Sequence, residues 1–183
     1  MEKEIFKKNI KLIERTKKYE GNILTVFEDK VDINGKISYF DYIENFFAVG
    51  ILPITNDEKI ILVKQYRLAV NDWTLEIPAG KLDVDGEKII DCAKRELEEE
   101  TGYKSNNLEF MLSINSSVAY WKSRIHLYIA RDLHKGNKKN DDNEETVEEI
   151  YSIDELRKMI NNGTIYDSKT IVAILTYIDK YKK

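Results

Sequence analysis

The segment from Glu87 to Gly102 constrains the fold more than any other part of the chain, because it combines a helical pattern with a concentration of carboxylates. Residues on a helix follow one another at roughly 100°, which gives this segment an apolar face and an adjacent acidic face: Ile90, Ala93 and Leu97 on the first, and Glu96, Glu99 and Glu100 on the second. Like charges so close together destabilise a helix unless a cation neutralises them. Since hard divalent cations prefer oxygen ligands, the pattern predicts an amphipathic helix that packs on a core and holds metal ions.

Arg95 lies four residues before Glu99 and two turns after Glu87. Its guanidinium can therefore fix the direction of a carboxylate by a bidentate contact. The alternative interpretation of the glutamates is an ordinary solvated acidic surface. A helix of that kind gains from lysines placed four residues after its glutamates, whereas this one crowds like charges on one side. We therefore interpret the carboxylates as functional.

The spacing of these residues resembles the box of the Nudix hydrolases: Gly, five residues, Glu, seven residues, Arg-Glu, an apolar residue, any residue, Glu-Glu, any residue, Gly and an apolar residue. The match is complete from Glu87 to Tyr103, but six residues separate Gly80 from Glu87. The additional residue falls in a turn-forming cluster, where an insertion lengthens a loop without rotating the helix. The resemblance implies an α/β (α+β) fold, namely the family's α/β/α sandwich with a mixed sheet and a catalytic box helix.

Three further segments are similar to the ADP-ribose pyrophosphatase branch of that family: residues 63–67, 76–83 and 167–170. The resemblance implies hydrolysis of the diphosphate bond of ADP-ribose or a similar nucleoside diphosphate sugar. It also implies Mg²⁺ or Mn²⁺ as the cofactor, held by Glu96, Glu99, Glu100 and the carbonyl of Ala79. The backbone at Ala79 is short of side chains, so that a metal can approach its carbonyl closely.

Catalytic roles are expected for Arg95, Glu99, Glu100 and an acid on a loop. In the resembling enzymes a glutamate after the last sheet strands acts as base or as an extra ligand. Residues 141–149 are the matching segment, in which Glu145 is the first choice and Glu144 and Glu148 are alternatives. Glu99 is the other candidate for the base.

Substrate contacts are expected from Arg67, Glu76 and Tyr42. Arg67 ends a strand, where it can contact a diphosphate or a terminal sugar or can form a surface ion pair. Glu76 can orient substrate or metal-bound water, or can serve as a cross-strand partner. Tyr42 belongs to a group of aromatic residues able to stack on adenine, although most of this group is expected in a core: Tyr39, Phe40, Tyr42, Phe46 and Phe47. Trp73 and Trp121 are other stacking candidates.

One segment departs from the ADP-ribose branch. Val118 and Ser123 stand where that branch usually has a proline and a glutamate. This weakens the case for ADP-ribose as against another nucleoside diphosphate derivative. Together with the insertion before the helix it leaves open a non-catalytic nucleotide-binding module on the same scaffold, but all acids of the box are present, so we favour an enzyme.

Composition limits the remaining possibilities. A chain of 183 residues with 42% hydrophobic content predicts one domain, residues 1–183. The net charge of −4 and pI near 5.4 favour a small nucleotide substrate and no nucleic acid. We expect no membrane segment. Cys92 is the single cysteine, so no intramolecular disulfide can form, and we expect a cytoplasmic protein. Cys92 itself is expected to be a small packing residue. The resemblance implies a homodimer, with residues 1–45 as N-terminal strands or an arm used in dimerisation.

Period-two patterns and turn residues predict the remaining elements. Strands at 23–31 and 36–43 flank Asn34-Gly35, a dipeptide suited to a hairpin turn. Strands at 48–55 and 59–66 form a second predicted hairpin, and further strands are predicted at 74–79, 108–114 and 124–130. Residues 134–143 predict a loop. Ser152 and Glu155 form a capping box before one helix, and Asp167 or Ser168 begins a last helix.

Overall fold

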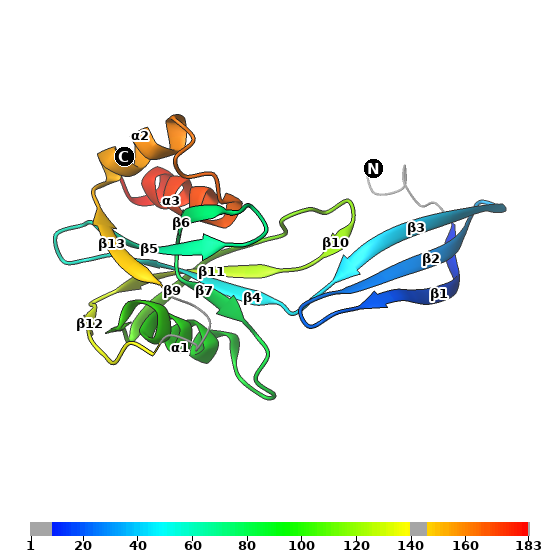
Figure 1. Ribbon diagram of the computed structural model, residues 1–183, viewed down its shortest axis with the longest axis horizontal. Helices are drawn as coiled ribbons and strands as arrows, with labels where there is room; N and C mark the ends of the chain where they lie inside the picture. Colours follow the sequence, from blue (N-terminus) through cyan, green and yellow to red (C-terminus); the bar gives the residue numbers. More distant parts are fainter. Residues whose placement is uncertain (1–8, 140–145, 183) are drawn as a thin grey trace, which may run out of the picture. The chain divides into compact units, whose positions relative to one another are not determined.

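The computed structural model describes residues 9–139 and 146–182, and its chain divides into two compact units. The first unit comprises the chain up to Phe46 together with Ser117–Ser123, and the second comprises Phe47–Ser116 and Arg124–Lys183. Figure 1 labels the elements of both. The single domain expected over residues 1–183 stays a prediction, because two compact units can belong to one functional domain.

The first unit is an antiparallel meander of β1 (Ile10–Glu20), β2 (Thr25–Ile33) and β3 (Lys36–Glu44). The short strand β10 (Trp121–Lys122) pairs in parallel with β3. Asn34 and Gly35 both have positive φ, 56° and 86°, as a tight hairpin turn requires. The hairpin predicted around this dipeptide is therefore confirmed.

Two larger sheets and one short ladder build the second unit. A mixed sheet has the order β7-β4-β11-β9, in which β11 runs parallel to β4 and the other neighbours are antiparallel. Its strands are β4 (Ala48–Pro53), β7 (Ala79–Lys81), β9 (Asn107–Ile114) and β11 (Ile125–Arg131). An antiparallel sheet is formed by β13 (Val147–Tyr151), β5 (Ile60–Arg67) and β6 (Asp72–Glu76). The short strands β8 (Tyr103–Lys104) and β12 (His134–Lys135) pair with each other.

Helices cover both faces of the mixed sheet in the second unit (Figure 1). Alternate residues of a strand point to opposite faces. Val49 and Ile51 accordingly pack with Cys92, Ala93 and Leu97 of α1 (Ile89–Thr101). Leu52, Leu127 and Ile129 belong to a second core cluster with residues of α2 (Ile153–Asn161) and α3 (Ser168–Tyr181). This arrangement confirms the expected α/β/α sandwich with a mixed sheet.

The second predicted hairpin is wrong in its pairing. Its turn exists, since the Thr55 N–H donates to the Lys59 carbonyl at 2.9 Å. Beyond the single bridge between Ile54 and Ile60, however, β4 and β5 belong to different sheets. Strands that are buried on both faces read as continuous apolar runs, and such runs do not specify their neighbours.

Helix ends follow the local signals in the sequence. Gly102 ends α1 in the left-handed conformation, with φ of 68° and its N–H bonded to the Glu98 carbonyl. The predicted capping box of Ser152 and Glu155 begins α2, and Asp167 caps α3. Among the described residues, no helix is long and apolar enough to cross a membrane.

Only part of the apolar face of α1 is buried against the sheet. Leu97 has no exposed surface, whereas Ile90, which the helical pattern placed on the core face, is 38% exposed. The pattern was wrong for Ile90, because the buried residues of α1 begin only at Cys92.

We expect Leu97→Ala to lower the free energy of unfolding by about 2 to 5 kcal/mol, and Ile90→Ala by less than about 1 kcal/mol. Urea unfolding of both variants measures this, and equal losses would contradict the packing described.

Candidate active site

Arg95 gathers three glutamates around one guanidinium. Its Nε and Nη2 contact the two carboxylate oxygens of Glu87 at 3.0 and 3.1 Å. Its Nη1 contacts Glu96 at 2.5 Å and Glu99 at 2.9 Å. The bidentate contact predicted from the spacing is therefore present, and it is made to Glu87. These hydrogen bonds lower the pKa of Glu87 below its usual value.

Glu96 lies against the backbone of Gly80. A Cβ atom built on Gly80 would come within 1.9 Å of the Glu96 carboxyl carbon, so only glycine leaves room for this side chain. Burial raises the pKa of Glu96 to about 7, although the Arg95 guanidinium opposes this shift. The nearby charges of Glu99 and Asp83 add to it. Burial and neighbouring negative charges thus disfavour the ionised form of Glu96, and a bound cation would stabilise it.

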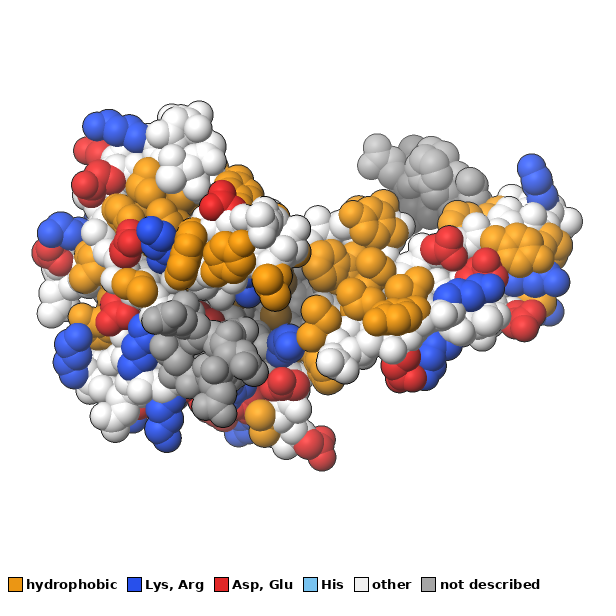
Figure 2. All heavy atoms as spheres, in the orientation of Figure 1, with side chains coloured by type: hydrophobic (Ala, Val, Ile, Leu, Met, Phe, Trp, Pro, Cys, Tyr) orange, Lys and Arg blue, Asp and Glu red, His pale blue; other side chains and the backbone are white. Residues whose placement is uncertain are grey.

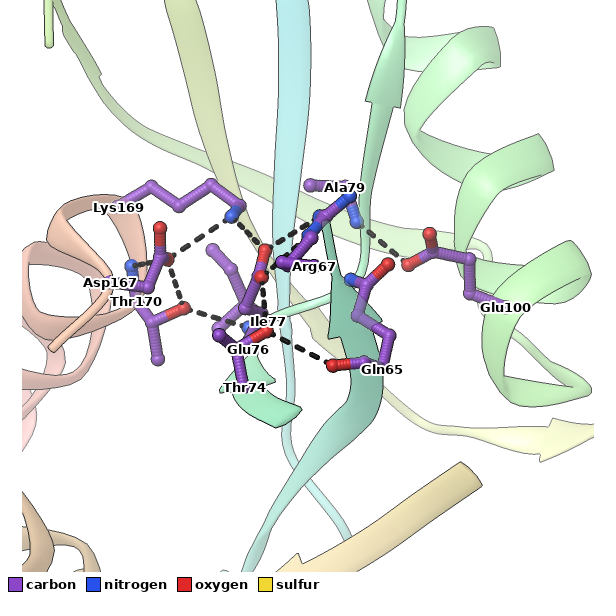
Figure 3. Close-up of polar contacts among 10 residues, drawn as sticks. All are labelled: Gln65, Arg67, Thr74, Glu76, Ile77, Ala79, Glu100, Asp167, Lys169 and Thr170. Carbon is purple, nitrogen blue, oxygen red and sulfur yellow. Dashed lines mark hydrogen bonds and ion pairs between the residues drawn. The ribbon is translucent and has the colours of Figure 1, made fainter. Parts of the chain in front are cut away.

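Glu100 links α1 to the start of β7. Its Oε2 accepts a hydrogen bond from the Ala79 N–H at 2.9 Å (Figure 3). Two residues earlier, the Ile77 N–H donates to Thr170 Oγ1 at 2.9 Å. The segment that carries Ala79 is therefore held between the acidic helix and the N-terminal turn of α3.

The segment expected to carry a catalytic acid is attached to the end of α1. The Lys139 N–H donates to the Glu99 carbonyl at 3.2 Å, and Thr146 Oγ1 donates to the Glu100 carbonyl at 3.2 Å. Residues 140–145, which include Glu144 and Glu145, lie outside the described residues. Glu148 is described, and it forms an ion pair with Lys138 at 2.6 Å.

A second charged cluster surrounds Glu76, which is only 3% exposed (Figure 3). Arg67 makes a bidentate contact to its carboxylate, with both distances 2.8 Å. Lys169 donates to the same carboxylate, and Thr74 Oγ1 donates to it at 2.7 Å. Burial alone would raise the pKa of Glu76, but Arg67 and Lys169 lower it to about 2. The carboxylate is thus fixed in its charged form, and it orients the guanidinium of Arg67.

The N-terminus of α3 contributes residues that the sequence reasoning did not assign. Asp167 accepts hydrogen bonds from Thr170 Oγ1 at 2.6 Å and from Lys169 Nζ at 3.1 Å. These residues lie in the segment 167–170, whose similarity to the ADP-ribose branch was the one signal that pointed to them. The structure shows what this segment does: Lys169 bonds to Glu76 and Thr170 bonds to the Ile77 N–H, so the segment attaches α3 to the end of β6.

Tyr42 lies in the first unit, on β3. Its ring stacks on Phe27 at 5.4 Å between centroids, and the Arg15 guanidinium lies 5.1 Å from the ring centroid. The interpretation of its aromatic neighbours as core residues is wrong: Tyr39, Phe40, Phe46 and Phe47 are 59%, 53%, 50% and 44% exposed. Hydrophobic side chains accordingly gather on the surface of the meander (Figure 2). The helices α1, α2 and α3 all belong to the second unit, so the described part of the first unit contains no helix that could bury these side chains.

The four expected metal ligands lie on α1 and at the start of β7. Glu96 and Glu99 are turned toward Arg95, and Glu100 toward the Ala79 N–H. Across residues 9–139 and 146–182, no three or more His, Cys, Asp or Glu side chains are grouped as a ready metal site. The donor chemistry nevertheless fits a hard divalent cation, because the carboxylates outnumber the single guanidinium beside them.

Cys92 has no exposed surface and packs between α1 and the mixed sheet. Burial raises the pKa of its thiol to about 12. The predicted packing role of this cysteine is confirmed.

The architecture and the acidic helix place this chain in a known family. The family model of the NUDIX domain matches residues 45–171, and the chain belongs to that family. A relative from Bacillus methanolicus, described as a methanol dehydrogenase activator, is 38% identical over 167 residues, which cover 90% of each chain. An ADP-ribose pyrophosphatase from Bacillus subtilis is 32% identical over 167 residues, again 90% of each chain. The crystal structure of an ADP compounds hydrolase shares the fold, with a TM-score of 0.84, 94% coverage of both chains and 21% identity.

The charged state of Glu76 predicts how stability depends on pH. Because the folded protein lowers the pKa of Glu76 from 4.5 to about 2, the charged carboxylate favours folding. Its contribution is complete above about pH 4.5 and disappears as the pH falls through about 2. We expect Glu76→Gln to lower the free energy of unfolding by about 3 kcal/mol at neutral pH, and the deficit to shrink with acidification.

Urea unfolding of the parent and of Glu76→Gln over a series of pH values measures this deficit. Asp179→Asn, an exposed substitution in α3, is the control and should change stability little at any pH. A Glu76→Gln deficit that stayed constant into acid would contradict the charged state assigned to Glu76.

Proposed function

We propose that this protein hydrolyses the diphosphate bond of ADP-ribose or a similar nucleoside diphosphate sugar, giving a nucleoside monophosphate and a sugar phosphate. The observation that carries the proposal is the acidic face of α1, where Glu96 and Glu100 are buried beside Gly80 and Ala79. The similarity to the ADP-ribose pyrophosphatase of Bacillus subtilis over 90% of both chains supports the choice of substrate.

Mg²⁺ or Mn²⁺ is the proposed cofactor, with Glu96, Glu99, Glu100 and the Ala79 carbonyl as ligands. When bound, such a cation neutralises charge on the diphosphate and lowers the pKa of a water molecule. Arg95 orients Glu96 and Glu99, and its bidentate contact to Glu87 anchors the guanidinium beside the helix, where these two glutamates would hold the cation.

Glu145 is the proposed base that takes the proton from the attacking water, with Glu99 as the alternative. What supports a base on this segment is the attachment of its two ends. Lys139 and Thr146, which flank residues 140–145, bond to the main-chain carbonyls of Glu99 and Glu100. The described residues on both sides of this segment are therefore bonded to the helix that carries the carboxylates.

Arg67 is the proposed contact to the diphosphate, because its bidentate contact to Glu76 fixes the position and direction of its guanidinium. Tyr42 is proposed to stack on the adenine, in a homodimer that forms through the N-terminal strands. The exposed aromatic side chains of the meander, among them Tyr39 and Phe40, support an interaction of this surface with a second copy. The cytoplasmic location stays a prediction from cysteine usage.

A second candidate function is the activation of a dehydrogenase. It is favoured by the 38% identity to the methanol dehydrogenase activator of Bacillus methanolicus over 90% of both chains. The two candidate functions are separable by assay.

The decisive experiment incubates the purified protein and Mg²⁺ with nucleoside diphosphate sugars, dinucleotides and nucleoside triphosphates, and measures the monophosphate released. Turnover of ADP-ribose, or of another nucleoside diphosphate sugar, is the expected result. Binding without turnover on any member would instead favour a non-catalytic module. A parallel assay adds the protein to a methanol dehydrogenase and measures its rate, so that activation without hydrolysis is recognised.

Substitution of Glu100 tests the metal assignment. We expect Glu100→Gln to lower kcat by about a hundredfold or more, because it removes the charge of one ligand. Folding should change little, since the amide oxygen of glutamine can still accept the Ala79 N–H. Glu98→Gln is the matched control on the same helix, because Glu98 pairs with Lys104 at 2.9 Å and has no proposed role. Full activity of Glu100→Gln at limiting Mg²⁺ would show the assignment to be wrong.

A further inference from the structure

Gln65 is a buried polar residue for which neither the fold nor the proposed mechanism gives a reason. It lies on β5, the middle strand of the antiparallel sheet β13-β5-β6, and it is only 5% exposed. Arg67 follows two residues later and therefore lies on the same face of the strand. On β6, Thr74 is the residue directly opposite Gln65. Gln65 thus belongs to the face that carries the Arg67–Glu76 ion pair.

The side-chain amide of Gln65 has no hydrogen-bond partner among the described residues. The one contact of this residue outside the strand ladder is made by its main-chain carbonyl, which accepts from Thr74 Oγ1 at 3.3 Å. A carboxamide carries two N–H donors and one acceptor oxygen. Among the described residues, the amide atoms of Gln65 are not among the fully buried side-chain atoms that lack a partner, so the amide reaches solvent although the residue as a whole is only 5% exposed. It is therefore accessible to a ligand that approaches this face of the sheet.

The surroundings of the amide explain why the protein itself does not satisfy it. Figure 3 shows the amide pointing from β5 toward the space between Arg67 and the Ala79–Glu100 hydrogen bond. The nearby carboxylates are already engaged: Glu76 by Arg67, Lys169 and Thr74, and Glu100 by the Ala79 N–H. None of these described carboxylates contacts the amide, so its donors remain available to a ligand.

We propose that the Gln65 amide contacts the substrate directly, by donating an N–H to a diphosphate oxygen of the bound nucleoside diphosphate sugar. This inference rests on the proposed function. A diphosphate offers only acceptors, and Arg67 places a cation on the same face of the sheet. The amide adds a neutral donor that is held in place by the strand and has no partner to give up when the ligand arrives. Binding therefore gains a hydrogen bond without breaking one in the protein.

This arrangement makes a prediction that a structural role for Gln65 does not share. Because the amide contacts no other described group of the protein, Gln65→Met removes no internal hydrogen bond and is expected to leave stability unchanged or higher. Ligand binding should nevertheless weaken by about tenfold or more, since a hydrogen bond to a charged phosphate oxygen is lost. If Gln65 instead stabilised the fold, Gln65→Met would lower the free energy of unfolding and the affinity for the ligand together.

The experiment measures the dissociation constant of ADP-ribose by calorimetry in EDTA, where no metal-dependent turnover occurs, and urea unfolding of the same samples. Three variants are compared with the parent. Gln65→Met removes the amide, and Gln65→Glu keeps its shape but replaces the donor with a negative charge, so it should weaken binding further. Tyr66→Phe is the matched control, because Tyr66 lies on the opposite face of the same strand, where its hydroxyl donates to Asn71 at 2.8 Å.

The expected result is weaker binding by both Gln65 variants, unchanged binding by Tyr66→Phe, and no loss of stability in Gln65→Met. Parent-like binding by Gln65→Met overturns the inference and leaves the proposed function intact. Destabilisation of Gln65→Met in proportion to its loss of binding also overturns the inference. A parent protein that neither binds nor hydrolyses ADP-ribose overturns the proposed substrate, and the inference with it.

Discussion

The contact between Arg95 and three glutamates is the interaction on which the site depends. Glu96 and Glu99 on α1 and Glu87 just before it would repel one another, and a single guanidinium offsets that repulsion with hydrogen bonds to all three. The compensation is incomplete, since burial still raises the pKa of Glu96 to about 7. The helix can therefore form, yet it keeps an excess of negative charge at the point where the backbone of Gly80 lies against the Glu96 carboxylate.

A single backbone connection joins the two charged clusters of the second unit. It runs from Glu76 at the end of β6 to Ala79 at the start of β7. The Ile77 N–H bonds to α3 and the Ala79 N–H bonds to α1, while the Pro78 carbonyl accepts from β4. Pro78 has no N–H, so each polar group named in this stretch has one defined partner. The Arg67–Glu76 pair and the acidic helix are therefore held in one rigid frame.

Local patterns predicted elements well and strand neighbours poorly. The Asn34-Gly35 turn and the capping box of Ser152 each depend on residues a few positions apart, and each was confirmed. Pairing between β4 and β5 was wrong, because both runs are apolar and several partners compete for them. The exposure of Ile90 could not be read from helical periodicity, which gives a direction around the helix and not the extent of the sheet beneath it.

The sequence alone determined the helix, its acidic face and the family, because helical period and carboxylate spacing are local properties of the chain. Only the tertiary structure decided the partners of those carboxylates and the roles open to Lys169, Thr170 and Gln65. Lys169 meets Glu76 across 93 positions in the sequence, and no local pattern encodes such a contact. Likewise, Gln65 is an ordinary strand residue in the sequence, and only burial without a partner distinguishes it. Long-range packing sets burial and pairing, so these features become visible once the sheets and helices are assembled.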